Sequence, residues 1–139
     1  MSWDSYIGNI IARSKDEFGN WYTDKACIIG IDGSLWTTAG HANAIRLTSK
    51  EAANIAKCFK AKEFSQFISC GIVAEGRKYI FIKEIDETTV FARLKNYGAL
   101  TLQCSKTGIV IAHTVEEFRP HITMKAVYAT VKYLEASNM

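Results

Sequence analysis

Aromatic rings are the side chains of this sequence best suited to bind a ligand. Trp3 and Tyr6 lie one helical turn apart in the first residues, Trp36 lies in an apolar stretch, and Tyr133 lies close to the last residue. Each ring taken singly also fits a place in a protein core. Gathered on the surface, the four rings would instead form a shallow apolar groove that marks a binding site.

The ligand chemistry that suits such a groove is a proline-rich segment. A polyproline II helix is already extended, presents flat apolar rings and leaves its carbonyl oxygens unpaired. Indole N–H and phenol O–H groups donate hydrogen bonds to such carbonyls. Asn9, one turn beyond Tyr6, adds an amide donor. The aromatic residues therefore predict recognition of a proline-rich ligand.

Catalytic chemistry has little support in the sequence. There is no GxxxxGKS/T, GxGxxG, HExxH or GxSxG motif. Neighbouring carboxylates occur at predicted turns, where solvated charge is the ordinary state, at Asp86-Glu87 and Glu116-Glu117. An enzyme would need His113 or His121 to act with a carboxylate in a cleft. No spacing supports this, and we predict a protein that is not an enzyme and has no catalytic residue.

The cysteines point to a reducing compartment rather than to a metal site. The sequence contains four of them, Cys27, Cys58, Cys70 and Cys104, with no CxxC pair and no histidine at ligand spacing. The first residues lack the features of a secretory signal, and no apolar run reaches the length of a membrane span. We therefore expect no metal, no cofactor and a cytoplasmic protein with reduced cysteines.

Length and charge exclude further classes. The 139 residues are 48% apolar with nine glycines and one proline, as expected for one globular domain over 1–139. The net charge of +3 comes without any run of five or six like charges. A dedicated nucleic-acid-binding protein is usually more basic, so we expect no nucleic acid among the partners.

Three helices are predicted to hold the aromatic residues and the core. Apolar residues at helical spacing predict the first over residues 2–14, with Ser2 as N-cap. Thr48-Ser49-Lys50-Glu51 has the form of a capping box and predicts a second helix over residues 49–59. Helical spacing returns after Pro120 and continues almost to the end of the chain.

The strands are predicted as one hairpin and one meander. Two short apolar runs on either side of Asp32-Gly33, residues 26–31 and 34–39, predict the hairpin. Later strand-like runs lie at residues 72–74, 78–85, 89–94, 99–104 and 108–113. Because their connections are short, neighbouring strands must be antiparallel. The predicted fold class is α+β, with the terminal helices side by side on one face of an antiparallel sheet.

The same residues resemble the profilin family in its animal-type, invertebrate form. The resemblance rests on Trp3-x-x-Tyr6-x-x-Asn9, on Ala26-Cys27-Ile28-Ile29-Gly30 leading to Trp36, and on Tyr133-Leu134. The segment 67–84 and the strand Ala92-Arg93-Leu94-Lys95 also look like the family's middle region. Length and element order agree over the whole chain.

The resemblance implies a central antiparallel sheet of about seven strands, with the N- and C-terminal helices on one face and a shorter helix on the other. It also implies a cytoskeleton-associated protein that binds monomeric actin, regulates actin polymerisation and nucleotide exchange on actin, and binds phosphatidylinositol 4,5-bisphosphate. Proline-rich partners would include formins and related nucleation-promoting factors. The implied proline-binding residues are Trp3, Tyr6, Asn9, Trp36, Tyr133, Leu134 and Met139.

The resemblance places the actin-binding residues on another surface. They are Ile68, Ser69, Lys78, Phe81, Lys83, Arg93, Lys95, Arg119 and Lys125. Cations in this set suit an acidic partner surface. Of these residues, Arg93 and Lys125 are also the implied phosphoinositide-binding pair.

One loop departs from the family pattern. Vertebrate members carry a glycine-rich turn before the last helix, where this chain reads Glu117-Phe118-Arg119-Pro120-His121. A bulkier, stiffer loop there is expected to weaken or retune actin affinity.

The alternative interpretation of the sequence is a small α+β regulatory or sensor module that dimerises or binds a small ligand.

Overall fold

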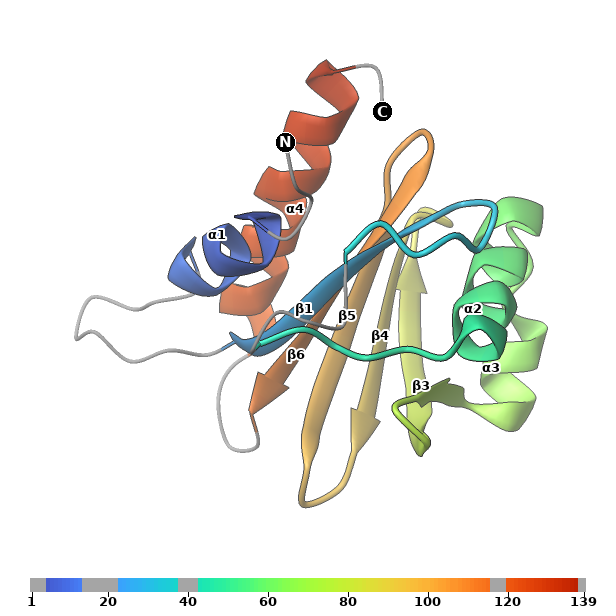
Figure 1. The fold of residues 1–139 in the computed structure, drawn as a ribbon. Coiled ribbons are helices and arrows are strands. Elements are labelled where there is room, and N and C mark those ends of the chain that lie inside the picture. Colours follow the sequence, from blue (N-terminus) through green and yellow to red (C-terminus); the bar gives the residue numbers. More distant parts are fainter. Residues whose placement is uncertain (1–4, 14–22, 38–42, 116–119, 138–139) are drawn as a thin grey trace.

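Four helices and six strands follow one another in the part of the chain that the structure, a computed structural model, describes: residues 5–13, 23–37, 43–115 and 120–137. Figure 1 shows their arrangement. The helices are α1 (Ser5–Arg13), α2 (Ser49–Ala61), α3 (Ser65–Cys70) and α4 (Pro120–Ala136). The strands are β1 (Thr23–Gly30), β2 (Ile72–Ala74), β3 (Arg77–Ile85), β4 (Thr89–Leu94), β5 (Gly98–Cys104) and β6 (Gly108–Val115).

All six strands form one antiparallel sheet in the order β1-β6-β5-β4-β3-β2. Strands β2 to β6 are paired in sequence order, which confirms the predicted meander. A long connection leads from β1 to α2, and the last strand, β6, later returns to pair with β1, with Ile28 opposite Val110. This pairing places β1 and β6 between the two layers of helices.

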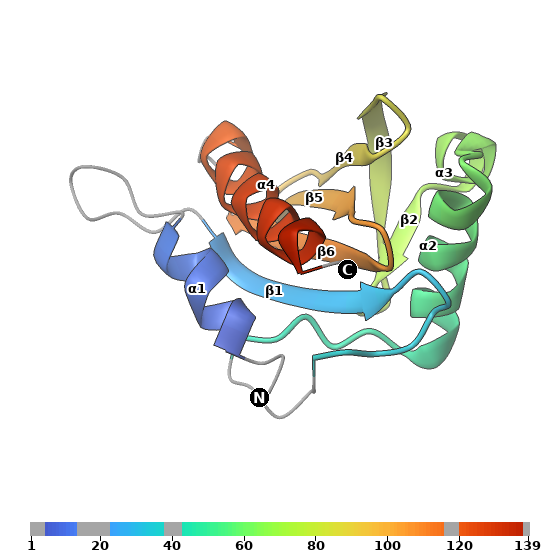
Figure 2. The ribbon, with the colours of Figure 1, turned by 90° about the horizontal axis from the view of Figure 1, so that it is seen from above.

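The sheet has a separate core on each face. Alternate residues of β1 point to opposite faces, so Cys27 and Ile29 pack with the α2 cluster while Ala26 and Ile28 pack with the α1 and α4 cluster. Figure 2 shows α1 and α4 together over one face, with α2 and α3 on the other side. The predicted fold class, with the terminal helices on one face, is confirmed.

The terminal helices are held by matching apolar stripes. Ile7 and Ile10 of α1 and Leu134 of α4 are fully buried in the cluster between the helices and the sheet. The spacing of these positions turns the rest of α1 and part of α4 outward.

Among the described helices, none combines the length and the apolar character that a membrane span needs.

The second helix begins as the sequence predicts. The Thr48 hydroxyl accepts from the Glu51 backbone N–H at 3.1 Å, and the Glu51 carboxylate accepts from the Thr48 N–H at 2.9 Å. The predicted capping box is therefore formed.

The short helix α3 was not predicted, because six residues with Phe67 as the one buried position carry too little periodicity. Phe67 packs there against the Phe59 and Phe64 rings.

The second arm of the predicted hairpin is formed only in part: the Gly30 N–H donates to the Ser34 carbonyl at 2.7 Å and the Trp36 N–H donates to the Ile28 carbonyl at 3.1 Å. Leu35 forms a single isolated bridge with Ile29, and part of the predicted arm, residues 38 and 39, lies outside the described residues. The Asp32 carboxylate holds Ser34 through its backbone N–H at 3.0 Å and its hydroxyl at 2.6 Å, which makes a local turn. Farther along, the edge of β1 pairs instead with Ala44. The described sheet consequently has six strands, where about seven were expected.

Candidate functional site

An open groove of about 600 Å³ runs between α1 and α4. We call it the helix groove, and its wall consists of Ser5, Tyr6, Asn9, Arg13, Thr130 and Tyr133. The α1 residues lie on one outward stripe because they are spaced three or four residues apart, while the isoleucines between them turn inward. Two packed helices therefore fix the wall of this groove from both sides.

Two tyrosines form the aromatic part of the helix groove. The rings of Tyr6 and Tyr133 are 5.8 Å apart with an interplanar angle of 56°. Tyr6 is half-buried, whereas 52% of Tyr133 is exposed. Burial, the nearby Tyr133 and the hydrogen bond between the two side chains raise the pKa of Tyr6. The phenol of Tyr6 is therefore protonated at neutral pH.

Polar side chains complete the helix groove. Asn9 is exposed on α1 beside Tyr6 and offers its amide to a ligand. The hydroxyl of Thr130 donates to the Ala126 carbonyl of its own helix at 3.0 Å, so that donor is already used. The groove thus combines aromatic surface with an amide, which fits a ligand that has both apolar rings and carbonyl acceptors.

Trp36 packs over two paired glycines beside the same core cluster. Gly30 and Gly108 are opposite each other in the β1–β6 ladder. A Cβ added to Gly108 would lie 2.8 Å from the Trp36 ring, so the ring needs a residue without a side chain beneath it. The Trp36 indole donates to the Ser34 hydroxyl at 3.2 Å. Trp36 packs against the cluster that also contacts Tyr6, but it is not part of the wall of the helix groove.

The remaining residues predicted for proline binding fall in two places. Leu134 has 0% exposure and supports the helix groove from within the core. Trp3 and Met139 lie outside the described residues. The structure therefore brings together Tyr6, Asn9 and Tyr133 of the predicted set. Sequence reasoning missed Ser5, Arg13 and Thr130, although the four-residue spacing of Ser5, Asn9 and Arg13 was a visible signal.

A second surface lies where the first turns of α4 meet β3, β4 and β5. Two hollows share Met124, one bounded by Lys83 and Arg93 and the other by Lys125 and Tyr128. We call this surface the strand face, defined by Ile80, Ile82, Lys83, Phe91, Arg93, Met124, Lys125 and Tyr128. Because Met124 is common to both hollows, cations from two strands and one helix border one continuous surface.

The strand face mixes cations with exposed apolar groups. Ile80 is 66% exposed and Ile82 is 56% exposed. The ammonium group of Lys83 lies 5.5 Å from the centre of the Phe91 ring. Neighbouring apolar side chains at a sheet surface favour contact with a folded partner.

The residues predicted for actin binding are spread over more than this surface. Tyr79 and Phe81 pack toward the α2 cluster, so alternation along β3 turns Lys78 to the same side as Ile80. Ile68 and Ser69 are exposed on α3, on the other side of the sheet, and Lys95 lies in the turn after β4. Arg119 and the departing loop at residues 116–119 lie outside the described residues. The structure thus groups Lys78, Lys83, Arg93 and Lys125 and separates Ile68 and Ser69 from them.

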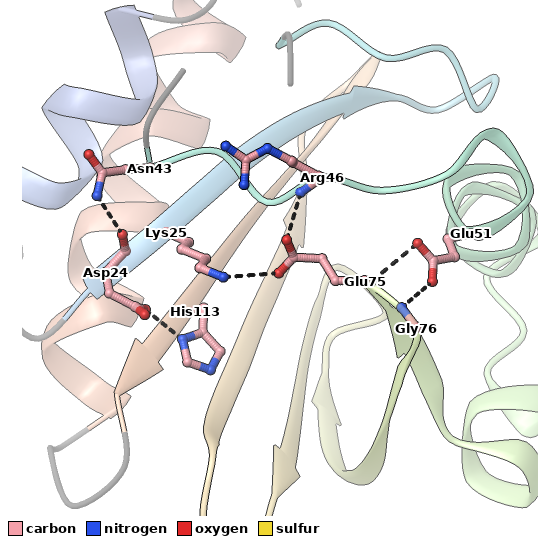
Figure 3. Close-up of polar contacts among 8 residues, drawn as sticks. All are labelled: Asp24, Lys25, Asn43, Arg46, Glu51, Glu75, Gly76 and His113. Carbon is pink, nitrogen blue, oxygen red and sulfur yellow. Dashed lines mark hydrogen bonds and ion pairs between the residues drawn. The ribbon is translucent and has the colours of Figure 1, made fainter. Parts of the chain in front are cut away.

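A polar network ties the β2–β3 turn to the first strand (Figure 3). The Glu75 carboxylate accepts from the Arg46 backbone N–H at 3.1 Å and lies 3.5 Å from the Lys25 ammonium. The Glu51 carboxylate accepts from the backbone N–H groups of Glu75 and Gly76 at 3.2 and 2.8 Å. Because backbone groups occupy these carboxylates, the network fixes a turn and does not form a catalytic pair.

The one histidine–carboxylate pair in the described residues is partly buried, because His113 is buried while 37% of the Asp24 side chain is exposed. Nδ1 of His113 is 2.5 Å from a carboxylate oxygen of Asp24 (Figure 3). His113 is 4% exposed, and the Tyr97 and Tyr79 rings pack against it at 5.0 and 6.2 Å. It borders neither the helix groove nor the strand face.

Comparison with known proteins identifies the family. The profilin family profile matches residues 1–139. The chain belongs to the profilin family. A profilin of the sea urchin Heliocidaris crassispina is 56% identical over 140 residues, with 100% of both chains covered. A profilin of the sponge Suberites domuncula is 51% identical over 140 residues, again with 100% of both covered.

Solved structures show the same fold. Acanthamoeba castellanii profilin II matches with a TM-score of 0.80 at 22% identity, covering 99% of this chain and 100% of that one. Mouse profilin IIa, solved in complex with a double repeat from the FH1 domain of mDia1, matches with a TM-score of 0.71 at 18% identity, covering 100% of both chains. LokiProfilin2, solved in a complex with rabbit actin, matches with a TM-score of 0.72 at 19% identity, covering 96% of this chain and 97% of that one.

Proposed function

We propose that this profilin is a non-catalytic adaptor of the cytoplasmic actin cytoskeleton. It binds an actin monomer with the strand face and a proline-rich segment with the helix groove, and it regulates actin polymerisation and nucleotide exchange on actin. Support comes from membership of the family together with relatives of the same fold that were solved with actin and with an FH1 repeat. The observation that carries the proposal is that two unlike binding surfaces lie on one small sheet scaffold.

The helix groove suits a proline-rich ligand. The Tyr6 and Tyr133 rings offer apolar surface at 5.8 Å from one another, and Asn9 offers an amide donor. A polyproline II ligand loses little conformational entropy when it binds, because it is extended beforehand. We propose the full predicted set as the proline-binding residues: Trp3, Tyr6, Asn9, Trp36, Tyr133, Leu134 and Met139. Leu134 acts by supporting the groove from the core.

The strand face suits a folded, acidic partner such as actin. Exposed Ile80 and Ile82 supply apolar contact area, and Lys83, Arg93 and Lys125 supply positive charge around it. Apolar contacts in such an arrangement provide affinity, while charges speed association and orient the partner. Of the predicted actin-binding residues, Lys78, Lys83, Arg93 and Lys125 lie on the side of the strand face. The other predicted residues, Ile68, Ser69, Phe81, Lys95 and Arg119, are proposed as actin contacts outside the strand face.

Phosphoinositide head groups are proposed to bind Arg93 and Lys125. Both cations border the strand face, one on either side of Met124. Phosphate groups attract such cations at the membrane surface. Because these residues also belong to the proposed actin site, phosphoinositide and actin are expected to compete.

Two surfaces on one domain explain how the protein would promote assembly. A proline-rich nucleation factor that holds the helix groove raises the effective concentration of the actin bound at the strand face. The gain needs no chemical step by this chain. Formins and related nucleation-promoting factors are the proposed proline-rich partners.

The proposal is tested by mixing the protein with monomeric actin and a ten-proline peptide on a sizing column with light scattering. We expect a 1:1 complex with actin that still binds labelled peptide. Failure to bind actin, or failure to bind peptide, contradicts the corresponding half of the proposal. A mass that rises with the concentration of the protein alone supports the dimerising module instead.

A further inference from the structure

Arg13 is the one charged residue among the described residues that line the helix groove. It lies in the last turn of α1, is exposed, and has no hydrogen bond or ion pair within the described part of the chain. The other wall residues are Ser5, Tyr6, Asn9, Thr130 and Tyr133, all of which are uncharged at neutral pH. A guanidinium in the wall with no carboxylate partner among the described residues is electrostatically complementary to a ligand that carries one negative charge.

The position of Arg13 relative to the tyrosine pair sets the position of that charge. Tyr6 and Arg13 are seven residues apart on α1, which corresponds to about 10 Å along the helix axis. A polyproline II ligand advances about 3.1 Å per residue, so about three residues span this distance. The charge would therefore lie on the ligand about three residues from the proline that contacts the Tyr6 and Tyr133 rings.

We propose that the helix groove prefers a proline-rich segment carrying an aspartate or glutamate about three residues from the proline on the tyrosine pair, and that Arg13 binds this carboxylate. The inference rests on the proposed function of the groove and adds to it the class of proline-rich ligand. A guanidinium suits this role because its planar fork donates two hydrogen bonds to one carboxylate.

Arg13 also has a purely structural alternative. A cation in the last turn of a helix interacts favourably with the C-terminal end of the helix dipole. That interaction would stabilise α1 to the same extent whichever peptide is bound. A difference between ligands that differ only in one charge separates binding of a carboxylate from helix stabilisation.

The test is a scan of ten-residue proline peptides in which one proline at a time is replaced by Asp or by its neutral isostere Asn. Each peptide is titrated into the whole protein at low salt, and binding is followed by calorimetry. At the best position we expect the Asp peptide to bind about threefold tighter than the Asn peptide, which is typical of an exposed ion pair. The preference should recur at positions three residues apart, because three residues make one turn of the ligand.

Three variants decide whether Arg13 is responsible. In Arg13→Gln the Asp and Asn peptides should bind equally, and in Arg13→Glu the Asp peptide should bind more weakly. Lys50→Gln is the matched control, because it makes the same change in net charge at an exposed position of α2, on the opposite side of the sheet. This variant should keep the preference for Asp.

Each outcome either supports or overturns the inference. Equal binding of Asp and Asn peptides to the unchanged protein, or a preference that persists in Arg13→Gln, overturns the inference and leaves the proline-binding function standing. Loss of binding by every peptide, including ten prolines, contradicts the proposed function and the inference together. Thermal unfolding of each variant shows whether it is folded under the conditions of the titration.

Discussion

The helix groove and the strand face are built in opposite ways. The groove lies between two helices whose inner residues, such as Ile10 and Leu134, are fully buried, and its aromatic part is one pair of tyrosines. The strand face lies on the same side of the sheet as α4 but over β3 and β4, where Ile80 and Ile82 stay exposed and the cations come from separate elements. The groove concentrates its contacts, whereas the strand face distributes them.

This difference affects how each surface responds to substitution. Removal of one ring should cost the groove most of its affinity, since few residues make its contacts. On the strand face, many residues share the contact, so single changes should have smaller effects.

Leu134→Ala is expected to have the largest effect. Leu134 is fully buried between α4 and the sheet, and truncation leaves a cavity that typically costs about 2–5 kcal/mol in the free energy of unfolding. Urea denaturation followed by circular dichroism measures this loss. Ile80→Ala, at 66% exposure on the strand face, is the control and should cost less than about 1 kcal/mol. Equal losses in the two variants would contradict the contrast.

Two tyrosines of α4 permit a matched test of the surfaces. Tyr133 in the helix groove is 52% exposed, and Tyr128 beside the strand face is 51% exposed. Tyr133→Ala should lower affinity for a ten-proline peptide by about 2 kcal/mol, or roughly thirtyfold, and leave actin affinity unchanged. Tyr128→Ala should weaken actin binding by a smaller factor and leave peptide binding unchanged. If either variant affects both ligands, the two surfaces are not independent.

Charge reversal on the strand face should act mainly on association rate. Lys83→Glu combined with Arg93→Glu replaces two cations that border the hollow next to Met124. We expect actin association to slow by about tenfold at low salt, with a smaller difference at high salt, because electrostatic steering is screened by ions. Stopped-flow fluorescence measures the rate. An effect that does not depend on salt would indicate lost packing rather than lost steering.

The smallest predicted effect concerns Tyr6 at alkaline pH. Its pKa in the folded protein is raised above that in the unfolded chain, chiefly by burial and then by Tyr133. The stabilising contribution is therefore complete below the unfolded pKa and is lost as pH rises through the folded value. Urea midpoints measured above about pH 10 should fall less steeply in Tyr6→Phe than in the unchanged protein. Identical slopes would show that Tyr6 has no such role.

Local sequence patterns were sufficient for most elements of this fold. The predicted ranges 72–74 and 89–94 match β2 and β4, and the capping box at Thr48 marks the start of α2, because alternation and capping depend on neighbouring residues. The second hairpin arm forms only one isolated bridge, from Leu35 to Ile29, and the bridge from Ala44 to Ala26 is a contact that no local pattern shows.

The candidate site likewise has some features that local sequence patterns predict and others that arise only when the chain folds. Residue type pointed to Tyr6 and Tyr133, because aromatic rings gathered on the surface form an apolar groove that can bind a ligand. The strand face could not be found from local pattern, since Met124 meets β3 and β4 only after the chain has folded. The role of Gly30 and Gly108 beneath Trp36 likewise depends on strand register.

The most direct test of the account asks whether both surfaces work at the same time. The affinity of the protein for a fluorescently labelled ten-proline peptide is measured by the anisotropy of the peptide, without actin and then with saturating actin monomer. Independent surfaces predict that the two dissociation constants agree within about twofold. A dissociation constant that rises with actin concentration would mean that actin and peptide compete for one surface, and would contradict the central claim.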